Sequence, residues 1–124
     1  MNVTARRFAN AVVVLAAGRL DQDTCEAFRA DLLKYVEEAA HDGGAIVLDL
    51  SALEYVSSAG LRCFMLAAKQ AKAQNSRIVI ASMQPVVAEI FQIARFNLVF
   101  EAYPKVRDAL ASLSPAAAAA FDRG

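Results

Sequence analysis

Two adjacent serines, Ser57 and Ser58, are the side chains whose type and position best suit reversible chemistry on a surface. Together with Ala59 and Gly60 they stand between a short apolar run, Ala45–Leu50, and a segment with helical periodicity. Serine is a preferred N-cap, so one hydroxyl could simply accept a hydrogen bond from the first helical turn, with Gly60 allowing close packing. A helix N-terminus also favours a phosphate, because its unpaired N–H groups and dipole attract negative charge. A phosphoserine adds between one and two negative charges, so the spacing leaves two interpretations open, a structural cap and a phosphorylation switch.

Further polar side chains precede the first predicted helix. Asp21, Asp23 and Thr24 lie in a polar loop immediately before it, where such residues usually act as helix caps. If the fold brings this loop beside the two serines, these three residues would join a recognition surface for a partner. Arg62 lies away from the apolar stripe of the second predicted helix, so it either faces solvent or contacts that partner.

The composition offers little material for catalysis or for binding metals and nucleic acids. The 13 Lys and Arg residues balance 13 Asp and Glu residues, whereas nucleic-acid-binding proteins normally carry a basic excess. The nearest approach to a basic cluster is Arg62 with Lys69 and Lys72 on one segment. His41 is the only histidine, and no glycine-rich phosphate loop of the GxxxxGKS/T or GxGxxG kind is present. We therefore expect no catalytic residue, no metal site and no cofactor.

The apolar residues predict a buried core rather than a membrane segment. Cys25 and Cys63 each fall within an apolar helical pattern, which is typical of core residues rather than of a disulfide or metal pair. No apolar run approaches the roughly 18–20 residues that a membrane-spanning helix needs, and the first residues show no secretory signal. We therefore expect a cytoplasmic protein with no membrane partner.

Strand and helix patterns alternate along the chain in the order ββαβαβαβα. The pattern predicts strands over 2–8 and 11–17 with a turn near Asn10, a helix of about 17 residues from Cys25 ended by Gly43-Gly44, a strand over 45–50, a loop over 51–57, a helix ending near Asn75, a strand over 77–81, a helix from Pro85, a strand over 99–103 and a helix over 104–113.

This alternation predicts an α/β fold in which a mixed, mainly parallel sheet packs against helices. The opening hairpin adds an antiparallel edge, and the strand over 45–50 is central because its apolar run suits burial on both faces. We expect one domain over residues 1–113. The alanine-rich residues 114–124 are expected to form a frayed tail, because Pro115 interrupts any helix there.

The order Asp-Leu-Ser-x-Leu-x-Tyr-Val-Ser-Ser-Ala-Gly-Leu-Arg over residues 49–62 resembles the signature of STAS domains, specifically the bacterial anti-sigma factor antagonists. Three other segments match the family pattern more weakly, each in the order and at the spacing found in the family. They are Gly18-Arg-Leu-Asp21, Pro85-Val-Val-Ala-Glu-Ile-Phe, and Phe100-x-x-Tyr-x-x-x-x-x-Ala-Leu. The resemblance covers residues 3 to 113 and implies the STAS fold.

The resemblance also implies a switch protein and not an enzyme. In this family the dephosphorylated protein binds an anti-sigma factor that is also a serine kinase with a histidine-kinase-like ATPase fold, and so frees a sigma factor or an equivalent target. The kinase phosphorylates a serine, which ends the binding, and a PP2C-type phosphatase reverses it. The family motif places the phosphoacceptor at Ser58 and, less favourably, at Ser57, where many members carry aspartate. The implied partner-binding surface comprises Asp21, Asp23, Thr24, Ser57, Ser58, Ala59, Gly60 and Arg62.

Two alternatives stay open. The absence of an acidic side chain at Ser57 is also compatible with an unphosphorylated STAS scaffold, for example a subunit of a lipid-transport complex. A small enzyme or nucleotide-binding protein ranks last, because the phosphate-binding loops are missing. The exposed edge of the opening hairpin allows a monomer or a weak dimer.

Overall fold

The computed structural model describes residues 1–41 and 44–124 and shows a mixed α/β fold. Gly43, half of the predicted Gly43-Gly44 helix stop, lies outside the described residues. The elements, in chain order, are β1 (Asn2–Phe8), β2 (Ala11–Leu20), α1 (Cys25–His41), β3 (Ala45–Asp49), β4 (Leu53–Val56), α2 (Ser58–Ala73), β5 (Arg77–Ala81), α3 (Pro85–Ile93), the 3₁₀ helix η1 (Phe96–Leu98), β6 (Ala102–Tyr103), α4 (Val106–Leu113) and α5 (Pro115–Arg123).

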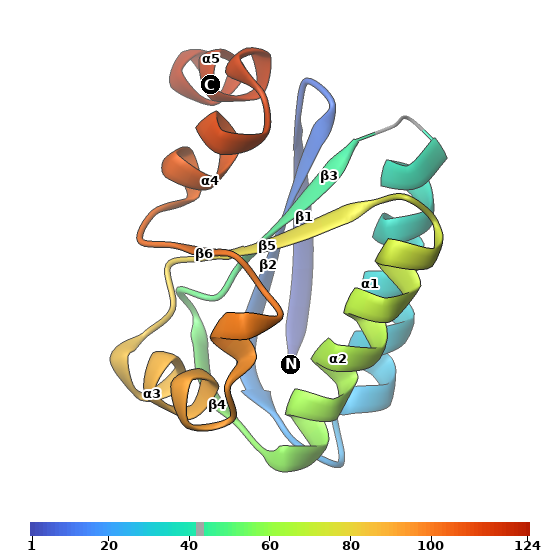
Figure 1. Cartoon of the computed structure of the whole chain (residues 1–124), viewed down its shortest axis with the longest axis vertical. Helices are drawn as coiled ribbons and strands as arrows, with labels where there is room; N and C mark the ends of the chain where they lie inside the picture. The colour runs from blue at the N-terminus through green and yellow to red at the C-terminus, as the bar shows by residue number, and fades with distance from the viewer. Residues whose placement is uncertain (42–43) are drawn as a thin grey trace.

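The strands form one sheet in the order β1-β2-β3-β5-β6, with β4 attached to β2 (Figure 1). β1 runs antiparallel to β2, and the other paired strands are parallel. Residues Ala11–Leu15 of β2 pair with β3, whereas Gly18–Leu20 pair with β4 after a register shift. Gly18 has a φ of 110° at that shift, which glycine adopts without strain. The predicted parallel sheet, antiparallel edge hairpin and central third strand are confirmed.

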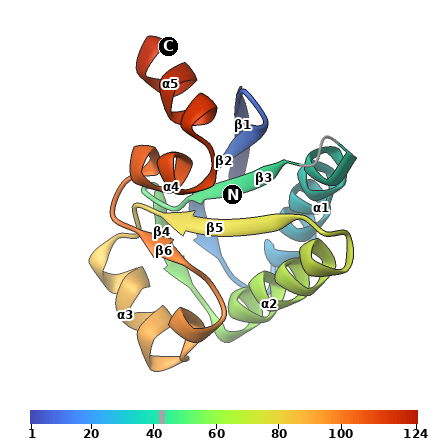
Figure 2. The ribbon, with the colours of Figure 1, turned by 45° about the horizontal axis from the view of Figure 1, so that its top comes forward.

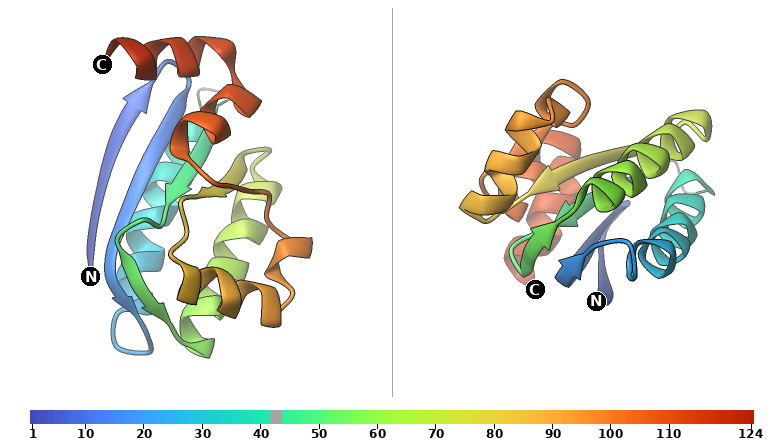
Figure 3. Two further views of the ribbon diagram at one scale, coloured as in Figure 1. Left: turned by 90° about the vertical axis from the view of Figure 1, so that its left-hand side faces the viewer. Right: turned by 90° about the horizontal axis from the view of Figure 1, so that it is seen from below.

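Helices cover both faces of the sheet, because alternate residues along each strand point to opposite sides. Along β2, Val12 and Val14 belong to the core under α1 and α2, while Ala11 and Val13 belong to the core under α4 and α5. Figures 2 and 3 show α1 and α2 side by side on one side of the sheet and α4 with α5 on the other. The sheet therefore carries two separate apolar layers.

A cluster of aromatic rings sets the position of α2. Phe64 of α2 lies edge-on to Phe28 of α1 and to Phe91 of α3, with ring centroids 5.4 Å apart in both pairs. All three rings are almost completely buried. Edge-to-face aromatic pairs add stabilisation to the area they bury, so this cluster holds the N-terminus of α2 in a fixed place at the end of the sheet.

Some segments differ from the prediction. Part of the predicted loop over 51–57 is the strand β4, which pairs with the end of β2. The prediction of a frayed tail was wrong, because residues 115–123 form α5. The Ser114 hydroxyl accepts a hydrogen bond from the Ala117 N–H at 3.3 Å and caps this helix, so Pro115 begins a helix instead of interrupting one.

The last strand, β6, is shorter than the predicted 99–103, because residues 99–101 form a turn and an irregular segment between η1 and β6. None of the helices within 1–41 and 44–124 is long and apolar enough to cross a bilayer.

Candidate functional site

The junction between β4 and α2 gives the two serines different environments. Ser57 is the N-cap of α2, and its hydroxyl accepts a hydrogen bond from the Gly60 N–H at 3.2 Å. Ser58 is the first residue of the helix and is exposed. Its hydroxyl makes no hydrogen bond to any described residue. The cap and the exposed hydroxyl are therefore separate functions of two neighbouring side chains.

Gly60 lets α2 approach the ends of two strands. A Cβ at this position would lie 2.8 Å from the Leu20 carbonyl oxygen and 2.8 Å from Val56 Cγ2, closer than real Cβ contacts come. The backbone N–H of Ser57 donates to the same Leu20 oxygen at 2.9 Å. The predicted role of Gly60 in close packing agrees with this geometry.

The loop before α1 is held by reciprocal hydrogen bonds. One carboxylate oxygen of Asp21 accepts from the backbone N–H of Asp23 at 3.0 Å and of Thr24 at 3.2 Å. The Thr24 hydroxyl accepts from the Asp21 N–H at 3.0 Å and donates to the Arg19 carbonyl at 2.9 Å. Asp21 and Thr24 thus act as caps that shape the loop, while Asp23 is exposed.

Parallel pairing of β2 with β4 brings this loop beside the serine junction. Leu20 pairs with Val56, so the segments that follow the two strands leave the same end of the sheet. An open pocket of about 670 Å³ lies between the two helices that begin there. From α2 it is lined by Ser58, Ala59, Arg62, Cys63 and Leu66, and from α1 by Cys25, Glu26 and Arg29.

Of the predicted site residues, Ser58, Ala59 and Arg62 line this pocket together. The other predicted residues do not line it: Asp21, Asp23 and Thr24 lie in the loop that precedes the lining residue Cys25, Ser57 caps α2, and Gly60 contacts the ends of β2 and β4. Glu26, Arg29 and Leu66 also line the pocket and were not predicted from the sequence. Their signal was the helical spacing of positions 26 and 29 and of positions 58, 62 and 66, but only the packing of α1 on α2 unites the two sets.

The charges around the pocket are weakly paired. Arg29 and Glu26 form an exposed ion pair at 3.3 Å, and Arg62 makes no ion pair with a described residue. Cys25 and Cys63 are buried free thiols, as predicted. Burial, reinforced by a hydrogen bond with Cys25, raises the pKa of the Cys63 thiol to about 12. At neutral pH the Cys63 thiol is therefore a neutral packing group.

The described side chains around the junction include no group that could hold a metal ion. Within the described part of the chain, no three His, Cys, Asp or Glu side chains come close enough to hold a metal ion. His41 ends α1, whereas the pocket lies at its beginning. What the junction offers is an exposed hydroxyl, a nearby arginine and an open pocket between the beginnings of two helices.

Comparison with known proteins identifies relatives over most of the chain. The family model described as "Mlab, STAS domain" matches residues 3–101. BtrV of Bordetella bronchiseptica, which is named as an anti-sigma factor antagonist, is 31% identical over 98% of this chain and 95% of its own.

Solved structures show the same fold at lower identity. An anti-sigma factor antagonist from Mycobacterium paratuberculosis aligns with a TM-score of 0.74 and 21% identity over 90% of this chain and 92% of its own. Unphosphorylated SpoIIAA, an anti-sigma factor antagonist from Bacillus, aligns with a TM-score of 0.70 and 17% identity over 90% of this chain and 95% of its own.

Proposed function

The chain belongs to the STAS domain family, and we propose that it is an anti-sigma factor antagonist switched by phosphorylation at Ser58. In its unphosphorylated form it binds an anti-sigma factor that is also a serine kinase, and this binding frees the sequestered sigma factor or equivalent target. Phosphorylation ends the binding, and a PP2C-type phosphatase restores it. The chain itself acts as a docking surface and not as an enzyme.

The relatives support the class of function. BtrV carries the antagonist name and aligns with almost the whole chain. SpoIIAA has solved structures in an unphosphorylated and a phosphorylated form, which align with TM-scores of 0.70 and 0.64. A protein of this fold therefore accepts a phosphate.

The observation that favours Ser58 as the phosphoacceptor is the different environment of the two serine hydroxyls. The Ser57 hydroxyl is engaged as the N-cap of α2, whereas the Ser58 hydroxyl is exposed and accessible to a kinase. In the transfer, the Ser58 oxygen forms a bond to the γ-phosphorus of ATP as the bond to the β-phosphate oxygen breaks. The hydroxyl proton passes to a base on the kinase, and ADP leaves.

A phosphate at Ser58 changes the surface more than the fold. It adds between one and two negative charges at the N-terminus of α2, where the helix dipole and free N–H groups favour an anion. Arg62 follows one helical turn later on the same face, where residues four apart are neighbours. The folded chain therefore accommodates the phosphate, while a partner that faces the pocket meets a new charge and a larger side chain.

The test uses intact mass and binding with candidate kinases of the histidine-kinase-like ATPase fold. We expect wild type and S57A to gain one phosphoryl group from ATP and S58A to gain none. S57A serves as the matched control, although it should lose about 1 kcal/mol of stability with its cap. S58A should bind the kinase as wild type does, and S58D at least about tenfold more weakly, as expected for a charge placed in an interface. Phosphorylation of S58A, or wild-type affinity of S58D, would refute the proposal.

An unphosphorylated scaffold is the second candidate, favoured by Ser57 in place of the aspartate of many members and by the Mlab description of the matching family model. Such a subunit would co-purify with an ABC-type ATPase of a lipid-transport complex. S58D should leave that complex intact, whereas its release by S58D would count against the scaffold.

A further inference from the structure

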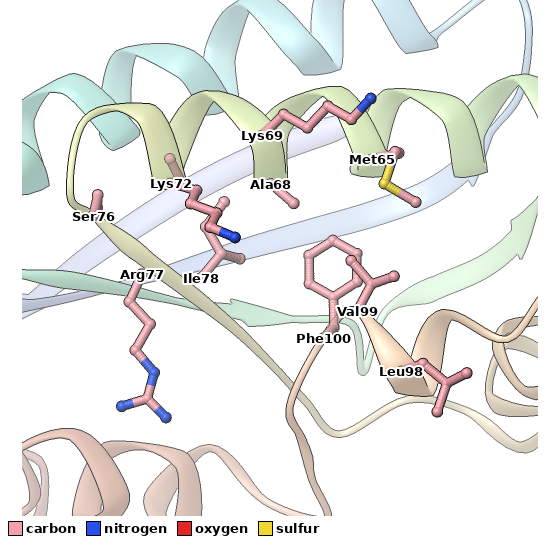
Figure 4. Close-up of a pocket in the computed structure, with 11 residues that line it drawn as sticks. Met65, Ala68, Lys69, Lys72, Ser76, Arg77, Ile78, Leu98, Val99 and Phe100 are labelled. Carbon is pink, nitrogen blue, oxygen red and sulfur yellow. The ribbon is translucent and has the colours of Figure 1, made fainter.

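A second open pocket lies between the later part of α2 and the segment around η1 (Figure 4). It has a volume of about 450 Å³, and we call it the α2–η1 groove. Its lining residues are Met65, Ala68, Lys69, Ala71, Lys72, Ser76, Arg77, Ile78, Leu98, Val99 and Phe100. None of these residues belongs to the Ser57–Arg62 junction, so the groove is a separate feature of the surface.

The groove has an apolar floor and an unusually exposed apolar lip. Phe100 is buried and lies beneath α2, which contributes Met65 to the apolar lining from above (Figure 4). Leu98 is 78% exposed and Val99 48% exposed at the opposite wall. Exposed apolar groups gathered beside a hollow are typical of a surface that another molecule covers.

The rim of the groove is positively charged. Lys69 and Lys72 are exposed, and neither forms an ion pair within the described part of the chain. Arg77 is different, because its guanidinium is engaged by Glu101. No acidic side chain lines the groove, and α2 contains none along its whole length. The two lysines are therefore available to carboxylates from outside.

One polar atom in the groove wall also lacks a partner. The Ser76 hydroxyl oxygen is buried and makes no hydrogen bond with the described residues. A buried polar group without a hydrogen bond is costly, so this part of the groove wall is locally unfavourable.

We propose that the α2–η1 groove docks an acidic amphipathic segment of a partner protein. Its apolar side chains pack against Leu98, Val99 and the groove floor, and its carboxylates pair with Lys69 and Lys72. The two lysines are three residues apart and lie on one side of α2, so they can meet successive acidic side chains of a helix. The occupant has the opposite charge to the rim and the same apolar character as the lip.

This docking site is independent of Ser58. Lys69 lies roughly 16 Å further along α2 at 1.5 Å per residue, and charges in salt solution are screened within about 8 Å. A phosphate at Ser58 should therefore leave the groove unchanged, and the groove proposal does not depend on whether Ser58 is phosphorylated.

The test is an NMR titration of the full chain, labelled with ¹⁵N, using three probes. Two synthetic helical peptides share leucines at every third and fourth position and carry either glutamate or lysine between them, and the third probe is laurate. We expect the glutamate peptide to shift the backbone amides of residues 65–77 and 98–100 at submillimolar concentration. The lysine peptide should not shift them.

Matched variants locate the contact. K69E/K72E should weaken the affinity for the glutamate peptide about fivefold or more, because the reversed charges repel the peptide. K34E on α1 should change this affinity by less than about twofold. L98S should weaken it, while I93S, at a position 76% exposed but outside the groove lining, should not. S58D should leave the affinity within about twofold.

Three outcomes would overturn the proposal. The first is equal binding of the lysine peptide, which would remove the role of charge. The second is binding of laurate without the glutamate peptide, which would make the groove a site for a small amphiphile. The third is the absence of shifts with every probe at millimolar concentration.

Discussion

At the scale of single residues, Cys63 shows how neighbours determine the chemistry of a side chain. It is 3% exposed and faces α1 from α2, where Cys25 begins the opposing helix. Burial disfavours the thiolate most strongly, and the hydrogen bond with Cys25 adds to the effect, so the pKa of the Cys63 thiol rises from 9.0 to about 12. Because thiolates are the reactive form, a cysteine on the wall of the Ser58 pocket is chemically protected.

Native-state alkylation provides the measurement. We expect iodoacetamide at pH 8 to leave Cys63 unmodified in the folded chain and to modify it promptly in urea, as read by mass spectrometry. The raised pKa also contributes stability that is complete below pH 9 and is lost as the pH rises towards 12, so C63A should make the alkaline loss of stability shallower. Prompt modification of Cys63 without denaturant would contradict this protection.

The same scale shows which parts of the site the sequence can predict. Capping is local chemistry, so Ser57 and Gly60 could be assigned from residue types three positions apart. Glu26, Arg29 and Leu66 could not, because they reach the pocket only through the packing of α1 against α2. The spacing of residues within one helix does not indicate which residues of another helix will lie beside them.

At the scale of elements, α5 shows how a helix signal can be misread. Pro115 favours a break inside a helix but suits the first position of a new one, and the preceding Ser114 supplies the N-cap. The helix is then held by a bidentate ion pair between Arg107 and Asp122, at 2.8 and 2.9 Å. Phe121 completes the contact by packing edge-on against Phe8 of β1, with ring centroids 5.3 Å apart.

Replacing Phe121 tests whether this helix belongs to the folded core. We expect F121A to lower the free energy of unfolding by about 1–2 kcal/mol, since it removes a partly buried ring and its aromatic pair. R123A is the control on the same helix, because Arg123 is exposed, and its effect should stay within about 0.5 kcal/mol. Urea denaturation followed by circular dichroism measures both, and an unchanged F121A midpoint would show that α5 contributes nothing.

At the scale of the whole molecule, the sheet separates two apolar layers of different composition. The buried residues under α1 and α2 include the aromatic cluster around Phe64, whereas those described under α4 and α5 combine four alanines, among them Ala109 and Ala117, with Phe8 as the single buried phenylalanine. Strand periodicity predicts such a two-faced sheet, because alternating residues must be covered on both sides. It does not predict β4, whose pairing depends on the register shift of β2 at Gly18.

The unequal layers predict unequal local stability, which hydrogen exchange can measure. We expect the amides of α5 to exchange at least about tenfold faster than those of β3 and α2, because opening the α4–α5 layer exposes smaller side chains than opening the aromatic layer does. Destabilising the chain with low urea should narrow this difference, since global unfolding then contributes to every amide. Equal protection of α5 and β3 would instead show that both layers open only together. Ser58 lies at the end of the aromatic layer, on the other side of the sheet from α5. S58D should therefore leave the exchange rates of the α5 amides unchanged, which would show that the docking surface and the α4–α5 layer respond independently.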